Sequence, residues 1–506
     1  MKKLEFGTAG IRGILGDGEI YLNETHIIRV VDGFAKYLIE NFENAAQRGV
    51  VIGRDNRRQS KNFSQIASMV LSKYGIIVHY NEEISATPFI SYATRILNAV
   101  GAINITASHN PKEYNGVKLY DSEGCQLLPD AVEKMLSYFE EYDYFLEEKI
   151  LFELNNYIKF IPKKILDSYL NEVVKIGGTI NDLSNIKVAY TPQHGTGAKP
   201  VKEIFEILNI NAHFEEREMI EDTEFTYVNN PNPESPESFN NVLKIAVENN
   251  CDIALVTDPD ADRVGAAIRN NDNKYQIITG NETGILIFDY LLNKLSKEQI
   301  KNHYLIYSFV SSSLPKRIAD IHGMKSYMTE TGFKWIGNLV KKISENSPQK
   351  KFLFAFEESY GSLINEQICR DKDAIQSIVI LSKMASYYKR QGFNLIDVLD
   401  NIYLKYGFVQ SGTITLNINS YDHVDKIKKS FKELNISDSL FLDYNQGIRS
   451  IEPNNMLTYE FDDGSWISLR PSGTEPKIKI YLFFVNDIKE KAVNNYNKYF
   501  DILSKL

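Results

Sequence analysis

A pattern of strand, helix, strand, helix and strand recurs three times along this chain of 506 residues. Apolar runs that alternate with amphipathic helices indicate parallel strands joined by helical crossovers. The predicted strands of the three copies lie at 49–53, 76–80 and 101–105, at 186–190, 211–214 and 253–256, and at 303–309, 325–328 and 352–356. The predicted helices lie at 62–73 and 88–97, at 199–208 and 237–249, and at 314–322 and 333–344.

The chain beyond about Gly407 follows another pattern. Short strands in close succession favour an antiparallel sheet there, and they are predicted at 413–416, 447–451, 456–461, 465–469 and 477–484, with helices at 423–434 and 488–503. We therefore predict an α/β protein, with three similar mixed α/β domains plus a C-terminal α+β domain around a central active-site cleft. The predicted domain boundaries are 1–155, 156–276, 277–402 and 403–506.

Composition argues against several classes of function. Lysine and arginine number 57 against 66 aspartates and glutamates, and this net charge of −9 disfavours non-specific binding of nucleic acid. No apolar run reaches the roughly 18 residues that a membrane span needs, and the first seven residues do not fit a signal peptide. The three cysteines, Cys125, Cys251 and Cys369, are dispersed as is typical of reduced cytosolic thiols. We predict a cytoplasmic protein without a nucleic-acid or membrane partner.

Each third strand of the recurring pattern ends in a polar loop, and ligands of open α/β sheets bind beyond the carboxyl ends of the strands. The loop after 253–256 contains Asp258, Asp260 and Asp262. Three adjacent carboxylates repel one another unless a cation lies among them, and their hard oxygens suit Mg²⁺. The glycine and distal glutamate of an EF-hand do not follow at the required spacing. A magnesium site is favoured, and an exposed acidic turn is the alternative.

The loop after 101–105 carries Ser108 and His109, and Lys118 follows close in sequence. No G-x-S-x-G elbow is present, which disfavours an esterase. Beside a metal loop, a serine can carry a phosphoryl group whose charge Mg²⁺ offsets. Taken alone, Ser108 is interpreted as a capping residue and His109 as a surface residue.

Three further stretches carry polar groups that suit phosphates or hydroxyls. The loop 470–474 combines a guanidinium, two hydroxyls and a glycine, which together can bind a phosphate. Glu357 and Ser359 offer partners for hydroxyl groups. Arg12 lies in a glycine-rich stretch that lacks the G-x-G-x-x-G spacing, which disfavours a dinucleotide site. Helix capping or a solvated turn is the alternative interpretation of the first two stretches.

Five stretches together resemble the α-D-phosphohexomutase family, in the family's order and over essentially the whole chain. They are FGTAGIRG from Phe6, TASHNPKEYNGVKLY from Thr106, DPDADR from Asp258, EESYG from Glu357 and RPSGTEPKIKIY from Arg470. EESYG, with the segments PQHGTG at 192–197 and NPNPE at 230–234, is similar to the phosphoglucomutase branch close to the phosphopentomutases.

This resemblance implies a magnesium-dependent phosphosugar mutase. It implies that Ser108 is phosphorylated, and that Ser108 and the three aspartates hold Mg²⁺. The phosphoserine would give its phosphoryl group to a hexose monophosphate, glucose 1,6-bisphosphate would turn end for end, and its other phosphate would return to Ser108. The other implied roles are catalysis by Arg12, His109 and Lys118, substrate binding by Arg263, Glu357 and Ser359, and binding of the non-reacting phosphate by Arg470, Ser472, Gly473 and Thr474.

Lys118 is the first candidate for the base that takes the hydroxyl proton, because nearby Arg12 would lower its pKa. His109 is the second candidate. Glucose 1-phosphate and glucose 6-phosphate are the favoured substrates, and phosphomannomutase or phosphopentomutase activity is the alternative within the family. A metal-dependent phosphatase and a non-catalytic sugar-phosphate sensor are the alternatives outside it.

Overall fold

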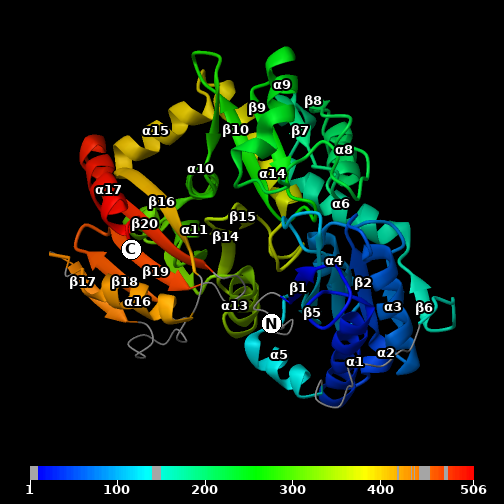
Figure 1. Ribbon diagram of the computed structural model, residues 1–506. Coiled ribbons are helices and arrows are strands. Elements are labelled where there is room, and N and C mark those ends of the chain that lie inside the picture. Colours follow the sequence, from blue (N-terminus) through cyan, green and yellow to red (C-terminus); the bar gives the residue numbers. More distant parts are fainter. Residues whose placement is uncertain are drawn as a thin grey trace.

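Within the described residues, four β-sheets with their helices follow one another along the chain (Figure 1). The computed structural model describes residues 10–138, 150–418, 421–434, 436–437, 439–443, 456–471 and 477–506. The blue N-terminal unit and the orange and red C-terminal unit lie on opposite sides of the view in Figure 1. No helix of these described ranges is long and apolar enough to cross a membrane.

The first unit is built on a six-stranded mixed sheet. Its strands are β1 (Ile11–Ile14), β2 (Val50–Arg54), β3 (Val78–Tyr80), β4 (Gly101–Ile105), β5 (Tyr114–Asp121) and β6 (Ile158–Phe160), in the order β1-β5-β4-β2-β3-β6. Its helices are α1 (Glu24–Asn41), α2 (Ala45–Arg48), α3 (Ser60–Lys73), α4 (Thr87–Ile96) and α5 (Pro129–Leu136). β6 lies beyond the predicted boundary at residue 155 and still pairs with β3 of this sheet.

The second and third units are built on smaller mixed sheets. The second has β7 (Lys187–Thr191), β8 (Asn211–Phe214), β9 (Ile253–Thr257), β10 (Val264–Arg269) and β11 (Tyr275–Ile278), with α6 (Lys163–Gly177), α7 (Ile180–Leu183), α8 (Ala198–Ile207) and α9 (Asn240–Glu248). The third has β12 (His303–Ser308), β13 (Lys325–Thr329), β14 (Lys351–Glu357) and β15 (Gly361–Leu363). Its helices are α10 (Gly280–Leu292), α11 (Lys297–Ile300), α12 (Leu314–His322), α13 (Phe333–Asn346), α14 (Ala374–Lys389) and α15 (Leu395–Tyr406).

The three sheets share one arrangement, which confirms the recurrence predicted from the sequence. In each sheet the third strand of the pattern lies beside the first, the second lies on the far side, and all three are parallel: β4-β2-β3, β9-β7-β8 and β14-β12-β13. An antiparallel strand (β5, β10 or β15) then returns beside the third strand. Each polar loop therefore connects the third strand to an antiparallel return strand. In a helical crossover, the loop after a strand would instead lead into a helix. The predicted domain boundaries stay a prediction.

The fourth unit is an antiparallel sheet with two helices. Its strands are β16 (Phe408–Asn417), β17 (Ser439–Asp443), β18 (Leu457–Phe461), β19 (Trp466–Pro471) and β20 (Lys477–Asn486), in the order β16-β20-β19-β18-β17, and its helices are α16 (Tyr421–Lys432) and α17 (Lys489–Leu503). Every pairing is antiparallel, as predicted. β17 was not predicted, and the strand predicted at 447–451 lies outside the described residues.

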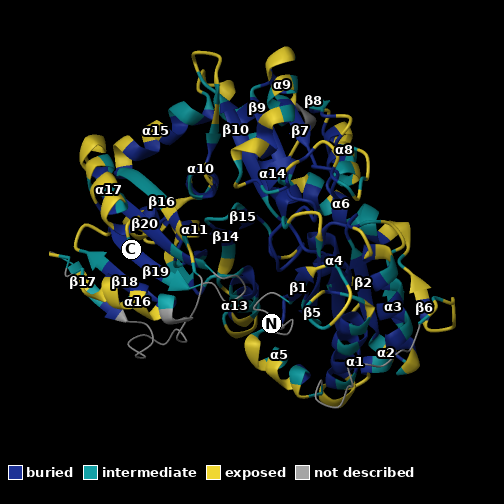
Figure 2. Cartoon of the chain, in the orientation of Figure 1, coloured by how far each residue is buried: buried dark blue, intermediate teal, exposed yellow. Residues whose placement is uncertain are grey.

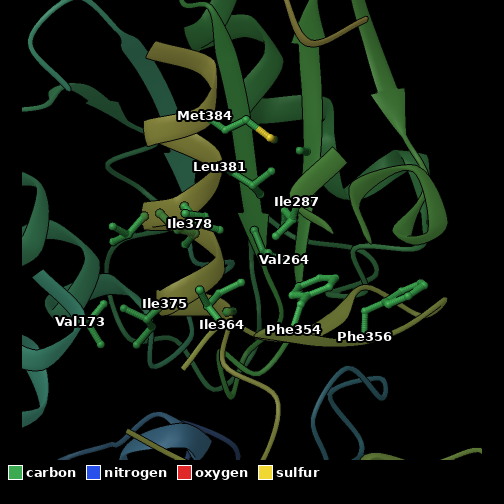
Figure 3. Close-up of a cluster of buried hydrophobic side chains, with 14 of the residues drawn as sticks. Val173, Val264, Ile287, Phe354, Phe356, Ile364, Ile375, Ile378, Leu381 and Met384 are labelled. Atoms are coloured by element: carbon green, nitrogen blue, oxygen red, sulfur yellow. The ribbon is translucent and has the colours of Figure 1, made fainter. Parts of the chain in front are cut away.

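One hydrophobic core runs across the second and third units and reaches α4 of the first. Figure 3 shows side chains from α14, β10, α10 and β14 gathered in it, among them Ile375, Ile378, Leu381, Met384, Val264, Ile287, Phe354 and Phe356. α14 also contacts α6 and α7. Each fully buried aliphatic or aromatic side chain contributes about 1.5–3 kcal/mol, so this shared core holds the two units together. Figure 2 shows the strands of these sheets mainly buried and the outer helix faces exposed.

Candidate active site

The three polar loops between a third strand and its return strand meet one another. Ser108 in the first loop donates a hydrogen bond from Oγ to Asp258 Oδ2 in the second loop, at 2.9 Å. The second loop in turn bonds to the third, because the backbone N–H of Val264 donates to the carbonyl of Tyr360 at 3.2 Å. The predicted convergence of these loops is therefore present, although they come from three different sheets.

Asp258, Asp260 and Asp262 form a buried acidic cluster whose ligand atoms all lie within 4.8 Å of one another. The loop is held by its own backbone, since the N–H groups of Asp262 and Arg263 both donate to Asp258 Oδ1, at 3.1 and 3.0 Å. In the part of the chain that the structure describes, no second group of at least three histidine, cysteine or acidic side chains is suited to a metal ion.

Two lysines from different units offset part of the charge of this cluster. Lys118 of β5 donates from Nζ to Asp260 Oδ2 at 2.6 Å and to Asp262 Oδ2 at 2.8 Å. Lys372, just before α14, places its Nζ 3.2 Å from the same Asp262 oxygen. Both lysines are at least nine-tenths buried. The acidic loop of the second unit is thus tied to the first and third units by ion pairs.

Ser108 lies in a loop that has a strained backbone and is held in place by hydrogen bonds from Arg57. Its backbone is left-handed, with φ of 52°, and its side chain is 1% exposed. The guanidinium of Arg57 donates to the carbonyls of Ser108, Asn110 and Pro111, at 2.6, 2.5 and 2.8 Å. A residue other than glycine is held in this conformation only when its surroundings determine it, and such residues gather at functional sites.

Family models match the chain in four consecutive stretches. Residues 3–145, 167–271 and 279–406 match the phosphoglucomutase/phosphomannomutase α/β/α domains I, II and III, and residues 420–482 match the C-terminal domain. The chain belongs to the phosphoglucomutase/phosphomannomutase family. It is therefore a phosphotransferase of the isomerase class, and the recognition made from its loop motifs is confirmed.

Relatives of this family member span nearly its full length. A phosphoglucomutase of Staphylococcus aureus (strain MRSA252) is 36% identical over 503 residues, which cover 95% of this chain and 89% of the relative. The structure of Paramecium parafusin, also named as a phosphoglucomutase, matches with a TM-score of 0.75 at 17% identity over 99% of this chain and 94% of that one. Aspergillus fumigatus N-acetylphosphoglucosamine mutase, in complex with GlcNAc-6P and magnesium, matches with a TM-score of 0.51 at 11% identity, over 93% of this chain and 84% of that one.

The acidic cluster fits the magnesium that the family implies. Asp260 Oδ1 and Asp262 Oδ1 are buried and accept no hydrogen bond, and leaving such atoms unpaired costs free energy. A divalent cation bound by these oxygens and by Asp258 would remove that cost, and carboxylate oxygens are the ligands that Mg²⁺ prefers. Burial and the two neighbouring carboxylates raise the pKa of Asp258 well above its usual value, and Arg263 offsets only part of this rise.

Arg12 lowers the pKa of Lys118 as expected, but the expectation that this pKa is lowered overall is wrong. Burial lowers the pKa of Lys118 and Arg12 lowers it further, but Asp260 and Asp262 outweigh both and raise it above its ordinary value. Lys118 is therefore an ammonium group. His109 differs, because burial and the charges of Arg263 and Arg12 lower its pKa well below the usual value. Its Nδ1 lies 3.3 Å from Ser108 Oγ.

Arg12, Arg263, Glu357 and Ser359 lie around this centre. Arg12 donates to Asn110 Oδ1 at 3.2 Å, beside the Ser108 loop. Arg263 pairs with Glu234 at 2.9 Å. Glu357 accepts the N–H of Gly332 at 2.6 Å, and its burial raises its pKa to about 7. Ser359 is half-buried in the turn that follows Glu357.

The phosphate loop of the fourth unit is described only at its beginning. Arg470 of β19 lies opposite Lys479 of β20. Ser472, Gly473 and Thr474 lie outside the described residues. Phosphate binding by this loop stays a prediction.

Sequence reasoning did not single out three residues of the site. Arg57 had a signal, since it follows the first predicted strand in the polar stretch GRDNRRQS. Thr87, whose hydroxyl donates to Asp260 Oδ2 at 2.7 Å across 173 positions, had none. Lys372 had none either, because its contact with Asp262 joins two sheets.

Proposed function

We propose that this chain is a phosphoglucomutase, which interconverts glucose 1-phosphate and glucose 6-phosphate through phosphorylated Ser108 and glucose 1,6-bisphosphate. The observation that carries the proposal is the 2.9 Å hydrogen bond from Ser108 Oγ to Asp258 Oδ2, because it joins a hydroxyl carrier to a buried carboxylate cluster. The Staphylococcus aureus relative, whose name is phosphoglucomutase, supports glucose phosphates as substrates. Phosphomannomutase or phosphopentomutase activity is the alternative.

We assign Asp258, Asp260, Asp262 and the phosphate of Ser108 as the ligands of Mg²⁺. The bound ion would offset the negative charge of the phosphoryl group during its transfer. The complex of the Aspergillus mutase with GlcNAc-6P and magnesium supports this assignment. Lys118 and Lys372 add positive charge at Asp262 in a site from which water is largely excluded, where such charges act strongly.

The transfer step exchanges one O–P bond for another. A hydroxyl oxygen of the sugar attacks the phosphorus of phosphoserine 108, and the bond from phosphorus to Ser108 Oγ breaks. The hydroxyl proton passes to a base, which returns a proton to the departing Ser108 Oγ. We assign that base to His109, whose Nδ1 lies 3.3 Å from Ser108 Oγ. Lys118 is the weaker candidate because its Nζ already donates to two carboxylates. Arg12 and Arg263 are assigned to the negative oxygens of the phosphoryl group.

Substrate binding is assigned to two further loops. Glu357 and Ser359 would take the sugar hydroxyls, and the loop from Arg470, with Ser472, Gly473 and Thr474, would take the phosphate that is not reacting. We also propose that the enzyme acts in the cytoplasm on free phosphosugars, because its net charge is −9 and its three cysteines are buried and unpaired. A nucleic acid or a membrane is not proposed as a partner.

The test is the isomerisation of three 1-phosphates by the purified protein with Mg²⁺ and a catalytic amount of glucose 1,6-bisphosphate. We expect glucose 1-phosphate to be converted faster than mannose 1-phosphate or ribose 1-phosphate. Faster conversion of mannose 1-phosphate or ribose 1-phosphate would identify that compound, in place of glucose 1-phosphate, as the preferred substrate. Release of inorganic phosphate without a sugar 6-phosphate product would point to a phosphatase instead.

A further inference from the structure

Asp371 is a buried carboxylate outside the acidic cluster, and it joins the first unit to the third. Asp371 is only 1% exposed. Its Oδ2 accepts hydrogen bonds from Tyr120 Oη at 3.1 Å and from Gln126 Nε2 at 2.7 Å. Its Oδ1 accepts the backbone N–H of Lys372 at 2.8 Å. A carboxylate at a boundary between units thus receives two side-chain donors from one side and a backbone donor from the other.

The partners of Asp371 lead to the acidic cluster by two routes. Tyr120 follows Lys118 by two positions on β5, so that both side chains lie on the same face of that strand. Lys118 Nζ reaches Asp262 Oδ2 at 2.8 Å. On the other route, Lys372 Nζ reaches the same oxygen at 3.2 Å. These contacts run from Lys118 through Asp262, Lys372 and Asp371 to Tyr120, and the backbone of β5 between Tyr120 and Lys118 closes this chain of contacts into a ring.

From this ring we propose that Asp371 is a positioning residue, which keeps the ammonium of Lys372 against Asp262 opposite that of Lys118. Two ammonium groups at one oxygen repel each other, and a free lysine side chain loses about 2 kcal/mol of rotamer entropy when it is fixed. Asp371 opposes both effects, since its Oδ1 holds the Lys372 backbone and lies 3.8 Å from Lys372 Nζ. Tyr120 and Gln126 hold Asp371 in turn. The inference rests on the proposed function, because the ring includes Asp262, which is a proposed ligand of the magnesium ion.

The same boundary offers a matched control. Arg370, next to Asp371, pairs with Glu123 of the first unit at 2.7 Å, and the Glu123 side chain is 39% exposed. An ion pair at this exposure contributes about 0–1 kcal/mol and does not belong to the ring. Glu123→Gln therefore disturbs the boundary between the units without reaching Lys372.

The first experiment compares Tyr120→Phe and Asp371→Asn with Glu123→Gln in the isomerisation of glucose 1-phosphate. A displaced ammonium reduces stabilisation of the transition state more than it reduces substrate binding. We therefore expect kcat to fall about 10- to 100-fold in Tyr120→Phe and Asp371→Asn. KM is expected to change by less than about threefold, since neither residue is assigned to the substrate. Glu123→Gln is expected to keep wild-type kcat. Equal losses in all three variants would mean that the boundary matters only for stability, and would overturn the proposal.

The second experiment asks whether Asp371 acts through Lys372. In a cycle of Asp371→Asn, Lys372→Met and the double variant, we expect the double variant to be no slower than Lys372→Met alone, because the residue to be positioned is gone. If the fold-losses of the two single variants multiplied in the double variant, the proposal would be overturned. A crystal structure of the Tyr120→Phe protein needs no activity, and we expect Lys372 Nζ to have left Asp262 in it; an unchanged contact would overturn the proposal. A wild-type protein that isomerises no phosphosugar would refute the proposed function and leave this structural test standing.

Discussion

Lys118 Nζ lies 2.8 Å from Asp262 Oδ2, in an ion pair between residues 144 positions apart, of which Lys118 lies on β5 of the first unit and Asp262 in the loop before β10 of the second. Both side chains are buried, with exposures of 2% and 0%. Removing one partner of a buried pair costs about 3–5 kcal/mol, because the other charge is left uncompensated. The metal loop is therefore held in place by the first unit, and the geometry between Ser108 and the aspartates depends on that contact.

Ser108→Ala should reduce mutase turnover by at least about 1000-fold, because it removes the oxygen that carries the phosphoryl group. Alanine tolerates the left-handed backbone about as well as serine, so the melting temperature should change little. Turnover is followed as glucose 6-phosphate formed from glucose 1-phosphate, and circular dichroism serves as the control for folding. Activity within tenfold of the wild type would contradict the role of Ser108.

Asp260→Asn should weaken Mg²⁺ binding and turnover together. It removes one of three charges that suit a hard cation, while the amide oxygen can take the place of Oδ2 and accept the hydrogen bonds from Thr87 and Lys118. Isothermal titration with MgCl₂ and the Mg²⁺ dependence of kcat measure the two effects. Treatment with EDTA should abolish wild-type activity, and added Mg²⁺ should restore it. Unchanged turnover in EDTA would mean that the metal assignment is wrong.

Glu357→Gln should remove a pH dependence from kcat/KM. Burial, reinforced by Glu358, raises the pKa of Glu357 to about 7, so the ionised form that accepts two hydroxyl bonds becomes scarce as the pH falls below 7. Between pH 8 and pH 6 its population falls about tenfold, and wild-type kcat/KM should fall with it. The substrate phosphate titrates near pH 6 as well, so the ratio of wild type to variant is the quantity to follow. A ratio independent of pH would contradict this role of Glu357.

The sequence predicted the three recurring cores and the residues of the acidic cluster because both depend on local patterns. Apolar runs of four or five residues that end in polar loops identify the strands β4, β9 and β14, and three aspartates two positions apart identify a metal loop. The return strands β5, β10 and β15 were not predicted, because each begins within or directly after a polar motif. The predicted direction of the Lys118 pKa was wrong because its two aspartate partners lie in a loop of the second unit. Such contacts depend on how the units dock, which no local pattern encodes.

Arg57→Lys should loosen the Ser108 loop and lower both stability and turnover. The Arg57 guanidinium is 2% exposed and donates to several carbonyls of this loop, while it pairs with Asp55 at 3.3 Å. A lysine ammonium cannot span these acceptors, and an unsatisfied buried acceptor costs about 1–3 kcal/mol. Arg58→Lys is the control, since the neighbouring Arg58 is exposed and pairs with Glu224. Thermal unfolding and turnover are measured for both variants, and only Arg57→Lys should fall below the wild type. Equal melting temperatures of the two variants would contradict the role of Arg57 in holding the Ser108 loop.

Asp289→Asn should stabilise the protein above pH 6 and not below pH 4. Asp289 of α10 is 6% exposed, and its burial raises its pKa to about 6. The folded state thus holds this proton more tightly than the unfolded chain, so stability is lost as the pH rises from about 4 to about 6 and the loss is complete above that range. The pKa difference corresponds to about 2–3 kcal/mol at pH 8.

Asparagine cannot ionise, and it can still accept the hydrogen bond that Asn293 Nδ2 donates to Asp289 at 2.8 Å. We therefore expect the melting temperature of Asp289→Asn to exceed that of the wild type at pH 8, with the difference vanishing toward pH 4. Asp400→Asn, at an exposed carboxylate of α15, is the control and should leave the melting temperature unchanged at both pH values. A melting-temperature difference that is the same at pH 4 and pH 8 would mean that ionisation of Asp289 is not what costs the wild type its stability.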